Sequence, residues 1–403
     1  MKIFLEGTAG PDGWPSPGCG CASCGRLAPG HRRPLSIVLD DRIRLSPHPS
    51  TAPAPVGDVS APTGGAAESP SCHRDPDAYR LERTPDGLAV TGPDGARLLH
   101  AALHSAERHV TDQPPMPFDV VLIDLLDRPE RLGDLRGRGL VTPETRVIAI
   151  GLDHRVPSER ELTRRLALWG ADAVPDGTVL DTRDRPAPTR PAPRRTLLLG
   201  GTRSGKSEEA ELRLAAEADV TYVATGPSGG DDPSWLARVK AHRDRRPAHW
   251  GTVETTDLAG LLRASSGTLL IDGLGTWIAA VFDECGAWPG YDHETPHGEA
   301  DTHGQSAPNR RRSTPEESSA DLPEEEPSPL DMVAARCDEL VDAWRRTSAR
   351  VVAVSDEVGL GVIPATASGR LFRDTLGRLN QRLARESEEV ALVVAGRLLP
   401  LPI

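Results

Sequence analysis

The sequence has few aromatic side chains and no long apolar run, and each shortage excludes a class of protein. Only 3% of the 403 residues are aromatic, while 39 are glycine and 38 are proline, so we expect part of the chain to form no packed core. No run of about 18 apolar residues and no charged-then-apolar leader occurs, which predicts a cytoplasmic protein without a membrane span. The formal net charge of −12 disfavours general binding to nucleic acid.

Lysine is almost absent, because 44 of the 47 basic residues are arginine. The three lysines are Lys2, Lys206 and Lys240. The arginine side chain ends in a planar fork and the lysine side chain in a compact point charge. A lysine inside such an arginine-rich chain therefore indicates a position where the two are not interchangeable. Cysteine is scarce too, but Cys19, Cys21 and Cys24 fall within one short segment. In a cytoplasmic chain this spacing indicates metal binding, and reduced thiols in a glycine-rich loop are the alternative.

Composition divides the chain into two domains. A Pro/Arg-rich linker at 182–195 separates a domain over 1–181 from one over 196–403. The Pro/Ala/Gly/Ser-rich segment 46–76 is expected to be flexible. Within the second domain, 286–330 is expected to be a disordered insert, since Tyr291 to Leu330 contains ten acidic residues against three arginines.

The pattern of apolar residues predicts an α/β protein. In the first domain we expect strands at "MKIFLEG" and "PLSIVLDDRIRL", a hairpin at "GLAVTGPDGARLLH", buried strands at "FDVVLIDLL" and "TRVIAIGL", and a helix at "SERELTRRLALWG". After the linker, "TLLLGG", "KSEEAELRLAAEA", "VTYVATG", "PSWLARVKAHRD" and "GTLLIDG" alternate between strand and helix. This alternation predicts a mostly parallel sheet with covering helices, in which "EVALVVAG" is the last strand.

The segment "GGTRSGKS" has the spacing G-x-x-x-x-G-K-S of a phosphate-binding loop, between an apolar strand and a helix. Its residues are Gly200, Gly201, Thr202, Arg203, Ser204, Gly205, Lys206 and Ser207. Glycines let backbone N–H groups surround phosphate oxygens, Lys206 reaches the terminal phosphates, and Ser207 can bind Mg²⁺. Asp272, which closes the strand "TLLID", is the second Mg²⁺ group that we expect.

His242 lies among basic residues in "RVKAHRDRRPAHW", and the residues alone leave two interpretations open. The segment can be a solvated basic end of a helix. Alternatively, His242 is the nucleophile of a nucleotidyl transferase, which attacks an α-phosphate, releases pyrophosphate and holds the nucleotide as a phosphoramidate. Neighbouring arginines would then offset the charge of the transition state.

Five segments of the second domain occur in the order found in a known enzyme family. They are "LLLGGTRSGKSEEAE", "YVATG", "RVKAHRDRRPAHWGTVE", "LLIDGLGTW" and "VSDEVGLGVIPATASGRLFRDTLGRLNQRLA". Together they resemble the bifunctional adenosylcobinamide kinase/adenosylcobinamide-phosphate guanylyltransferases of cobalamin biosynthesis. In the places of the family's "NEVGxGIVP" and "FRDxxGRxNQ" motifs this chain has Asp356-Glu357-Val358-Gly359, and Phe372-Arg373-Asp374 through Asn380-Gln381.

The resemblance assigns roles to individual residues. It makes His242 the guanylylated histidine, and the preceding Ala241 leaves no second candidate beside it. It implies that the nucleotide-binding residues outside the loop are Ala224, Thr225, Gly226, Arg243, Asp244, Arg245, Arg246, Glu254 and Asp272. His249 is expected to be structural.

The resemblance also implies a RecA-like P-loop fold, two reactions and a homotrimer. The hydroxyl of adenosylcobinamide would take the γ-phosphoryl group of ATP or GTP. GTP would then guanylylate His242, and the cobinamide phosphate would displace GMP to give adenosylcobinamide-GDP. Mg²⁺ is the expected metal of this domain.

The first domain carries a weaker resemblance. "FLEGTAGPDGWPSPGCGCASCGR" and "VIAIGLDHRVPSERELTRRLALWGADAVPDGTVL" resemble the opening and closing segments of metallo-β-lactamase-fold proteins, especially the phosphodiesterase branch. The catalytic metal pair of that fold needs an H-x-H-x-D-H cluster, and none of the twelve histidines forms H-x-H. Gly151 replaces the first histidine of the closing motif. The resemblance therefore implies a degenerate, non-catalytic αβ domain in which His154 joins Cys19, Cys21 and Cys24 at a structural Zn²⁺.

Two alternatives to the bifunctional enzyme stay open on the sequence. One is a metal-dependent hydrolase in residues 1–181, against which the missing histidine cluster counts. The other is a P-loop nucleotide-binding regulatory protein without corrinoid turnover, which would have no need of His242 as a nucleophile.

Overall fold

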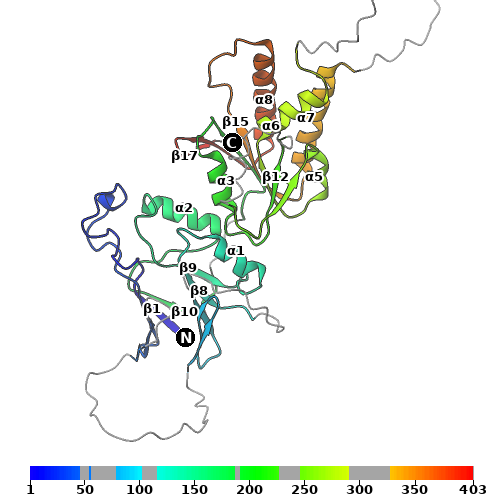
Figure 1. Ribbon diagram of the computed structural model, residues 1–403. Coiled ribbons are helices and arrows are strands. Elements are labelled where there is room, and N and C mark those ends of the chain that lie inside the picture. The colour runs from blue at the N-terminus through cyan, green and yellow to red at the C-terminus, as the bar shows by residue number, and fades with distance from the viewer. Residues whose placement is uncertain are drawn as a thin grey trace, which may run out of the picture.

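The computed structural model describes residues 1–45, 79–101, 116–186, 191–226, 246–289 and 327–402, together with the backbone of 54–55 (Figure 1). Most of the segment predicted to be flexible, 46–76, lies outside these ranges, as does 290–326 of the acidic insert. The predicted nucleophile His242 and its neighbours Arg243, Asp244 and Arg245 also lie outside them.

The second half of the chain forms a seven-stranded sheet in the order β13-β12-β14-β15-β11-β16-β17. Its strands are β11 (Arg195–Gly200), β12 (Thr221–Ala224), β13 (Gly251–Glu254), β14 (Thr268–Asp272), β15 (Arg350–Asp356), β16 (Glu389–Val394) and β17 (Arg397–Leu401). All neighbouring pairs are parallel except β16 and β17. The predicted α/β class with a mostly parallel sheet is therefore confirmed. The prediction that "EVALVVAG" is the last strand was wrong, because Ala395 and Gly396, with φ of 49° and 68°, turn the chain back into β17.

Helices cover both faces of this sheet. They are α3 (Lys206–Leu214), α5 (Leu258–Ala264), α6 (Leu274–Glu284), α7 (Pro329–Arg346) and α8 (Ala367–Arg385). The start of α7 is fixed by a capping box, in which Ser328 and Asp331 bond each other's backbone N–H groups, with Pro329 in the first turn. A buried cluster that includes Trp277, Trp344 and Phe282 joins α5, α6, α7 and α8 to one face of the sheet.

The first half of the chain contains two five-stranded sheets, ordered β10-β1-β2-β3-β4 and β5-β6-β7-β8-β9. The first sheet consists of β1 (Lys2–Gly7), β2 (Ser36–Leu39), β3 (Ile43–Leu45), β4 (Ala54–Pro55) and β10 (Thr178–Asp181). The second consists of β5 (Arg80–Thr84), β6 (Gly87–Thr91), β7 (Arg97–Ala101), β8 (Val120–Ile123) and β9 (Arg146–Ala149). The predicted single strand "PLSIVLDDRIRL" is instead the hairpin β2–β3, since Asp40 and Asp41 both adopt positive φ at a turn.

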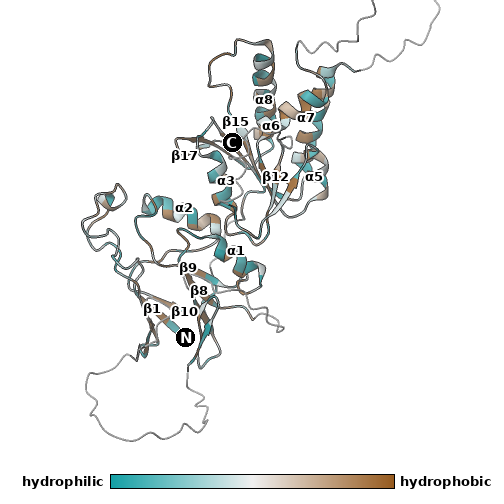
Figure 2. Cartoon of the chain, viewed as in Figure 1, coloured by the Kyte–Doolittle hydropathy of each residue, from teal (hydrophilic) through white to brown (hydrophobic). Residues whose placement is uncertain are grey.

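Successive side chains in the strands of the second sheet point to opposite faces, and each face is covered by a buried apolar cluster. Val120 and Leu122 of β8 pack toward the first sheet, in a cluster with Ile3 and Leu5 of β1. Val121 and Ile123 face the opposite way, toward the helices α1 (Glu130–Gly137) and α2 (Glu159–Trp169). In Figure 2 the strand β9 is largely brown, whereas α2 shows teal residues over much of its surface.

Residues of α3 and the turn after it pack into this same core. Ala216 is buried in the cluster that covers α1 and α2, and Leu212 packs against it. The two halves therefore touch through the helix that follows the phosphate-binding loop, although the exact domain bounds stay a prediction. Among the described residues, no helix combines the length and apolar character needed to cross a membrane.

Candidate functional site

The phosphate-binding loop connects β11 to α3, as predicted. Two residues take left-handed backbone conformations, Arg203 with φ of 59° and Gly205 with φ of 95°. A Cβ on Gly205 would lie 3.2 Å from the Cα of Gly396, so both conformation and space require glycine there. The N–H of Gly396 donates to the carbonyl of Ser204 (2.8 Å), which ties the loop to the β16–β17 turn. The loop is thus held at the carboxyl edge of the sheet, where parallel α/β folds bind ligands.

Lys206 lies at the first position of α3 and points toward the end of a neighbouring strand. Its Nζ lies 2.8 Å from Oδ1 of Asp356 and donates to the carbonyl of Gly201 at 3.2 Å. Asp356 ends β15, which pairs directly with β11. From the sequence, Asp356 was identified only as part of a matching family motif, and its position at the end of an apolar strand was the signal that it lies beside Lys206.

A buried amide from α8 holds the end of β15. Asn380 donates from Nδ2 to the carbonyl of Asp356 (3.0 Å) and accepts from the hydroxyl of Ser355 (2.7 Å). Both Asn380 and Ser355 are buried. Because every polar group in this contact has a partner, the position of Asp356 opposite Lys206 is well defined.

Ser207 and Asp272 come together as the sequence predicts. The Ser207 hydroxyl donates to Oδ1 of Asp272 (3.0 Å), and the phenol of Tyr222 donates to Oδ2 (2.7 Å). Burial, with the adjacent Asp272 carboxylate, raises the pKa of Tyr222, so the phenol stays protonated and keeps donating. The guanidinium of Arg246 lies over the Tyr222 ring, 3.2 Å from its centroid. A hydroxyl and a carboxylate are oxygen donors of the kind that Mg²⁺ prefers, so this pair fits the expected metal.

The other predicted nucleotide-site residues are spread along the same edge of the sheet. Ala224 ends β12, and the hydroxyl of the following Thr225 donates to the carbonyl of Gly273 at 2.7 Å. Gly226 comes next in the chain, and Glu254 ends the outer strand β13 with an exposed side chain. The structure therefore places Ala224 and Asp272 at the ends of adjoining strands, with Thr225 directly after Ala224, and Glu254 farther along the edge.

Comparison with known proteins identifies the second half of the chain. Residues 196–401 match the family model described as cobinamide kinase / cobinamide phosphate guanyltransferase. The chain belongs to this family. That confirms the resemblance inferred from the five sequence segments, and it covers the phosphate-binding loop, Asp272 and Asp356.

Curated members of the cobinamide kinase family are similar over nearly their whole length. The bifunctional adenosylcobalamin biosynthesis protein CobU of Salmonella typhimurium is 32% identical over 209 residues, which cover 50% of this chain and 95% of the relative. The protein of the same name in Escherichia coli is 32% identical over 204 residues, with 95% of it covered. The CobP protein of Pseudomonas aeruginosa is 33% identical over 215 residues, with 96% covered.

The first half of the chain lies outside the matched region, and its cysteine segment does form a cluster. The ligand atoms of Cys19, Cys21, Cys24 and His154 all lie within 4.8 Å of one another. Two hydrogen bonds join the cysteine segment to the segment after His154: Ser23 donates to the carbonyl of Val156 (2.6 Å), and Arg26 to that of Pro157 (3.0 Å).

A hydrogen bond also orients the histidine of this cluster. Nδ1 of His154 lies 3.2 Å from the hydroxyl of Ser16, a contact of the kind that orients a metal-binding histidine. Three thiols and one imidazole suit tetrahedral Zn²⁺, so the predicted residues fit a structural zinc.

Three carboxylates close to Gly151 surround an arginine. Arg155 bonds Asp153 through Nε (2.8 Å), Asp127 through Nη1 (2.7 Å) and Asp124 through Nη2 (2.8 Å). Its Nη2 also donates to the carbonyl of Gly151 at 2.7 Å. A guanidinium thus occupies the centre of the group, next to the position where the metallo-β-lactamase resemblance would require a histidine ligand.

Replacing Arg155 by alanine is expected to lower the free energy of unfolding by about 2 kcal/mol at neutral pH, because it leaves the partly buried carboxylates of Asp124 and Asp153 without their cation. Burial already raises the pKa of Asp124, and loss of the guanidinium, which lowers it, should raise it further. A folded-state pKa above the unfolded value means that the folded state binds more protons, so this variant should lose stability as pH rises. Chemical denaturation at about pH 5 and about pH 8 checks this sign.

Arg183 offers a matched control for this prediction, since it is largely exposed and pairs with the neighbouring Asp181 on the surface. The Arg183→Ala variant should show little change at either pH. A stability deficit of Arg155→Ala that is the same at both pH values would contradict the account.

Proposed function

We propose that this protein is a bifunctional enzyme that phosphorylates adenosylcobinamide and then transfers GMP from GTP to the product, giving adenosylcobinamide-GDP. The observation that carries this proposal is membership of the cobinamide kinase / cobinamide phosphate guanyltransferase family over residues 196–401. The geometry supports it, because Lys206, Ser207 and Asp272 meet at one edge of the sheet. A purely regulatory nucleotide-binding protein is not favoured, since the curated relatives are named as bifunctional biosynthetic proteins.

In the kinase step the backbone N–H groups of 200–207 would hold the phosphate chain, and Lys206 would stabilise the charge of the transferred γ-phosphoryl group. Ser207 and Asp272 would hold Mg²⁺, which supplies charge neutralisation for the phosphates when it is bound. The corrinoid hydroxyl attacks the γ-phosphorus, the bond to the nucleoside diphosphate breaks, and the hydroxyl proton is released. Lys206 lies against Asp356 here, so phosphate binding would replace that carboxylate as the partner of the lysine.

In the transferase step His242 would attack the α-phosphorus of GTP, and the bond to pyrophosphate would break. A phosphate oxygen of the cobinamide phosphate then attacks the same phosphorus and releases the histidine. The arginines at 243, 245 and 246 would offset the negative charge that develops at phosphorus. Among these arginines, Arg246 lies in the described part of the chain, beside Tyr222 and thus next to Asp272.

Two labelled forms of GTP test the proposed activity. The protein would be incubated with adenosylcobinamide, Mg²⁺ and GTP that carries ³²P at either the γ or the α position, and the corrinoids would be separated. Label from the γ position is expected in cobinamide phosphate and in the adenosylcobinamide-GDP formed from it, and label from the α position in adenosylcobinamide-GDP alone. A protein that binds GTP and leaves the corrinoid unlabelled from both positions would overturn the proposal.

A structural zinc in the first half of the chain is the second part of the proposal. The Cys₃His cluster would hold one Zn²⁺ and join the cysteine segment to the segment that leads into α2. We expect the Cys21→Ser variant to lose most of its zinc and to unfold at a temperature several degrees lower, because structural zinc contributes directly to folding. Elemental analysis and thermal unfolding measure both effects.

Cys285 is a suitable control for this prediction, since it lies in the second half of the chain and outside the cluster. The Cys285→Ser variant should keep the zinc content of the wild type. Equal zinc content in both variants would contradict the site. The homotrimer and the cytoplasmic location stay predictions.

A further inference from the structure

The helix of the phosphate-binding loop is held by the first half of the chain along its length. Near its C-terminal end, the indole Nε1 of Trp169 donates to the carbonyl of Leu212 (2.8 Å), and Nη1 of Arg136 donates to that of Ala216 (2.8 Å). The carbonyl of Leu212 also accepts from the N–H of Ala215 (3.4 Å), and Ala216 lies just beyond the helix, so both bonds tie the C-terminal end of α3 to the first half of the chain. Gly133 of α1 also approaches closely, since a Cβ there would lie 2.4 Å from the carbonyl oxygen of Glu217.

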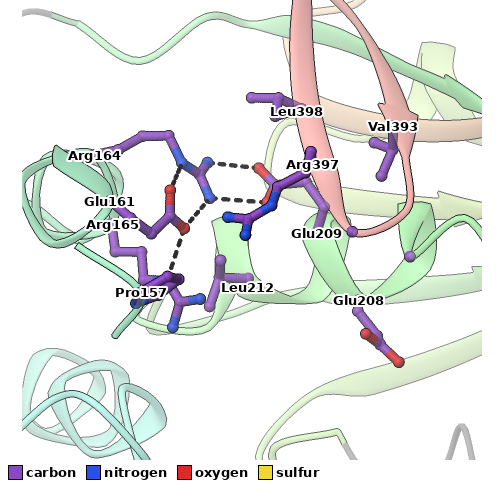
Figure 3. Close-up of a pocket in the computed structure, with 12 residues that line it drawn as sticks. Pro157, Glu161, Arg164, Arg165, Glu208, Glu209, Leu212, Val393, Arg397 and Leu398 are labelled. Carbon is purple, nitrogen blue, oxygen red and sulfur yellow. Dashed lines mark hydrogen bonds and ion pairs between the residues drawn. The ribbon is translucent and has the colours of Figure 1, made fainter. Parts of the chain in front are cut away.

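The beginning of α3 is held by a fork of two hydrogen bonds. Arg164 of α2 binds Glu209 through Nη1 to Oε1 (2.7 Å) and through Nη2 to Oε2 (3.0 Å), as Figure 3 shows. Glu209 lies in the first turn of α3, and its carboxylate is only 11% exposed. A bidentate arginine–carboxylate pair is both strong and directional, so it fixes the orientation of this turn.

The fork is part of a chain of alternating charges. On one side Arg164 also binds Glu161 of its own helix. On the other side Glu209 accepts from Nε of Arg213 (2.9 Å), and Arg213 in turn binds Glu389 of β16 (2.7 Å). This series of ion pairs thus runs from α2 through the first turn of α3 to the sheet.

Beside this pair of hydrogen bonds, a space remains between α2 in the first half of the chain and α3 and β17 in the second half. A cavity of about 300 Å³ lies there, and its lining includes Glu161, Arg164, Arg165, Gly205, Glu209 and Arg397 (Figure 3). Gly205 belongs to the phosphate-binding loop itself. This end of α3 borders a cavity, and on that side the ion pairs of Glu209 hold it.

We propose that Arg164 is a positioning residue, through which the first half of the chain sets the affinity of the phosphate-binding loop for nucleotide. Glu209 follows Ser207 by two residues on the same helix, and its N–H donates to the carbonyl of Gly205 (2.9 Å). Arg164 therefore orients the turn that carries Lys206 and Ser207. It also neutralises a carboxylate that would repel the phosphates of the incoming nucleotide. This inference rests on the proposed function for its role in the enzyme, but the effect of Arg164 on nucleotide binding does not depend on turnover.

The test compares two arginines of one helix in the full-length protein. Arg164 and Arg165 are 26% and 22% exposed and both bind Glu161, but within the described part of the chain Arg165 forms no ion pair with α3. The Kd for Mg²⁺-GTP, measured by titration calorimetry, is expected to rise at least about fivefold in Arg164→Ala and to stay within about twofold of the wild type in Arg165→Ala. If Arg164→Ala does not fold, Arg164→Gln, which keeps the length and removes the charge, must show the same rise.

Kinetics then separate positioning from general destabilisation. The KM for GTP in the kinase step should rise with the Kd, while kcat changes less. Unchanged GTP affinity in Arg164→Ala, or an equal rise in Arg165→Ala, would overturn the proposal. Wild-type protein that binds GTP without corrinoid turnover would instead overturn the proposed function and leave this comparison valid. Wild-type protein that binds no GTP would overturn both.

Discussion

Replacing Lys206 by alanine is expected to lower both the kinase and the guanylyl transfer rates by about a thousandfold. Lys206 supplies the positive charge at the phosphate chain, and removing one preorganised electrostatic group from a phosphoryl-transfer site costs about this factor. Steady-state assays with γ- and α-labelled GTP would measure the two losses. Lys206→Arg should recover little, because an arginine fork does not match the position of a point charge in the loop.

Lys2 provides the control for this prediction, since it lies on the exposed side of β1 in the first half of the chain. The Lys2→Ala variant should keep both activities, which would show that loss of a lysine charge elsewhere has no such effect. Kinase activity of Lys206→Ala within about tenfold of the wild type would contradict the role given to the loop.

Replacing His242 by alanine is expected to separate the two activities. Guanylyl transfer should fall by at least about a thousandfold, because removal of a covalent nucleophile leaves no other route through the same intermediate. Phosphorylation of adenosylcobinamide should change only a few-fold, since a P-loop kinase needs no histidine nucleophile. The two products, separated from one reaction, report both rates at once.

His249 is the matched control, because it lies in the same basic segment and its Nε2 contacts the carbonyl of Glu217 at 3.2 Å. A glutamine at this position can keep such a bond. His249→Gln should therefore retain both activities. Loss of both activities in His242→Ala would show that this histidine supports the fold or the nucleotide site, and would contradict a role confined to guanylyl transfer.

Local patterns were sufficient to predict the phosphate-binding loop and the class of the fold. The spacing in "GGTRSGKS" requires a strand before it and a helix after it, and β11 and α3 stand in these positions. The pairing of Ser207 with Asp272 followed from the same logic, because the ends of parallel strands meet at one edge of a sheet. The turns were less predictable. The hairpin β2–β3 depends on Asp40 and Asp41 at positive φ, and the sequence "DD" is a weak signal for such a turn.

Contacts between distant segments could not be predicted from one sequence. Arg155 neutralises Asp124 and Asp127 from another strand connection, and nothing in their local sequence marks them as partners. The same holds for Arg164 and Glu209, which are 45 residues apart and lie in different halves of the chain. For the Cys₃His cluster, only the resemblance connected His154 with the cysteines, because the intervening 129 residues give no spacing rule.

Covalent labelling by α-³²P-GTP tests the central claim most directly. Wild-type, His242→Ala and His249→Gln proteins would be incubated with Mg²⁺ and α-³²P-GTP, denatured, and treated with acid or base. The account predicts label on the wild type and on His249→Gln that is stable to base and lost in acid, as expected of a phosphoramidate, and no label on His242→Ala. Wild-type protein that binds GTP and acquires no label, or equal labelling of His242→Ala, would contradict it.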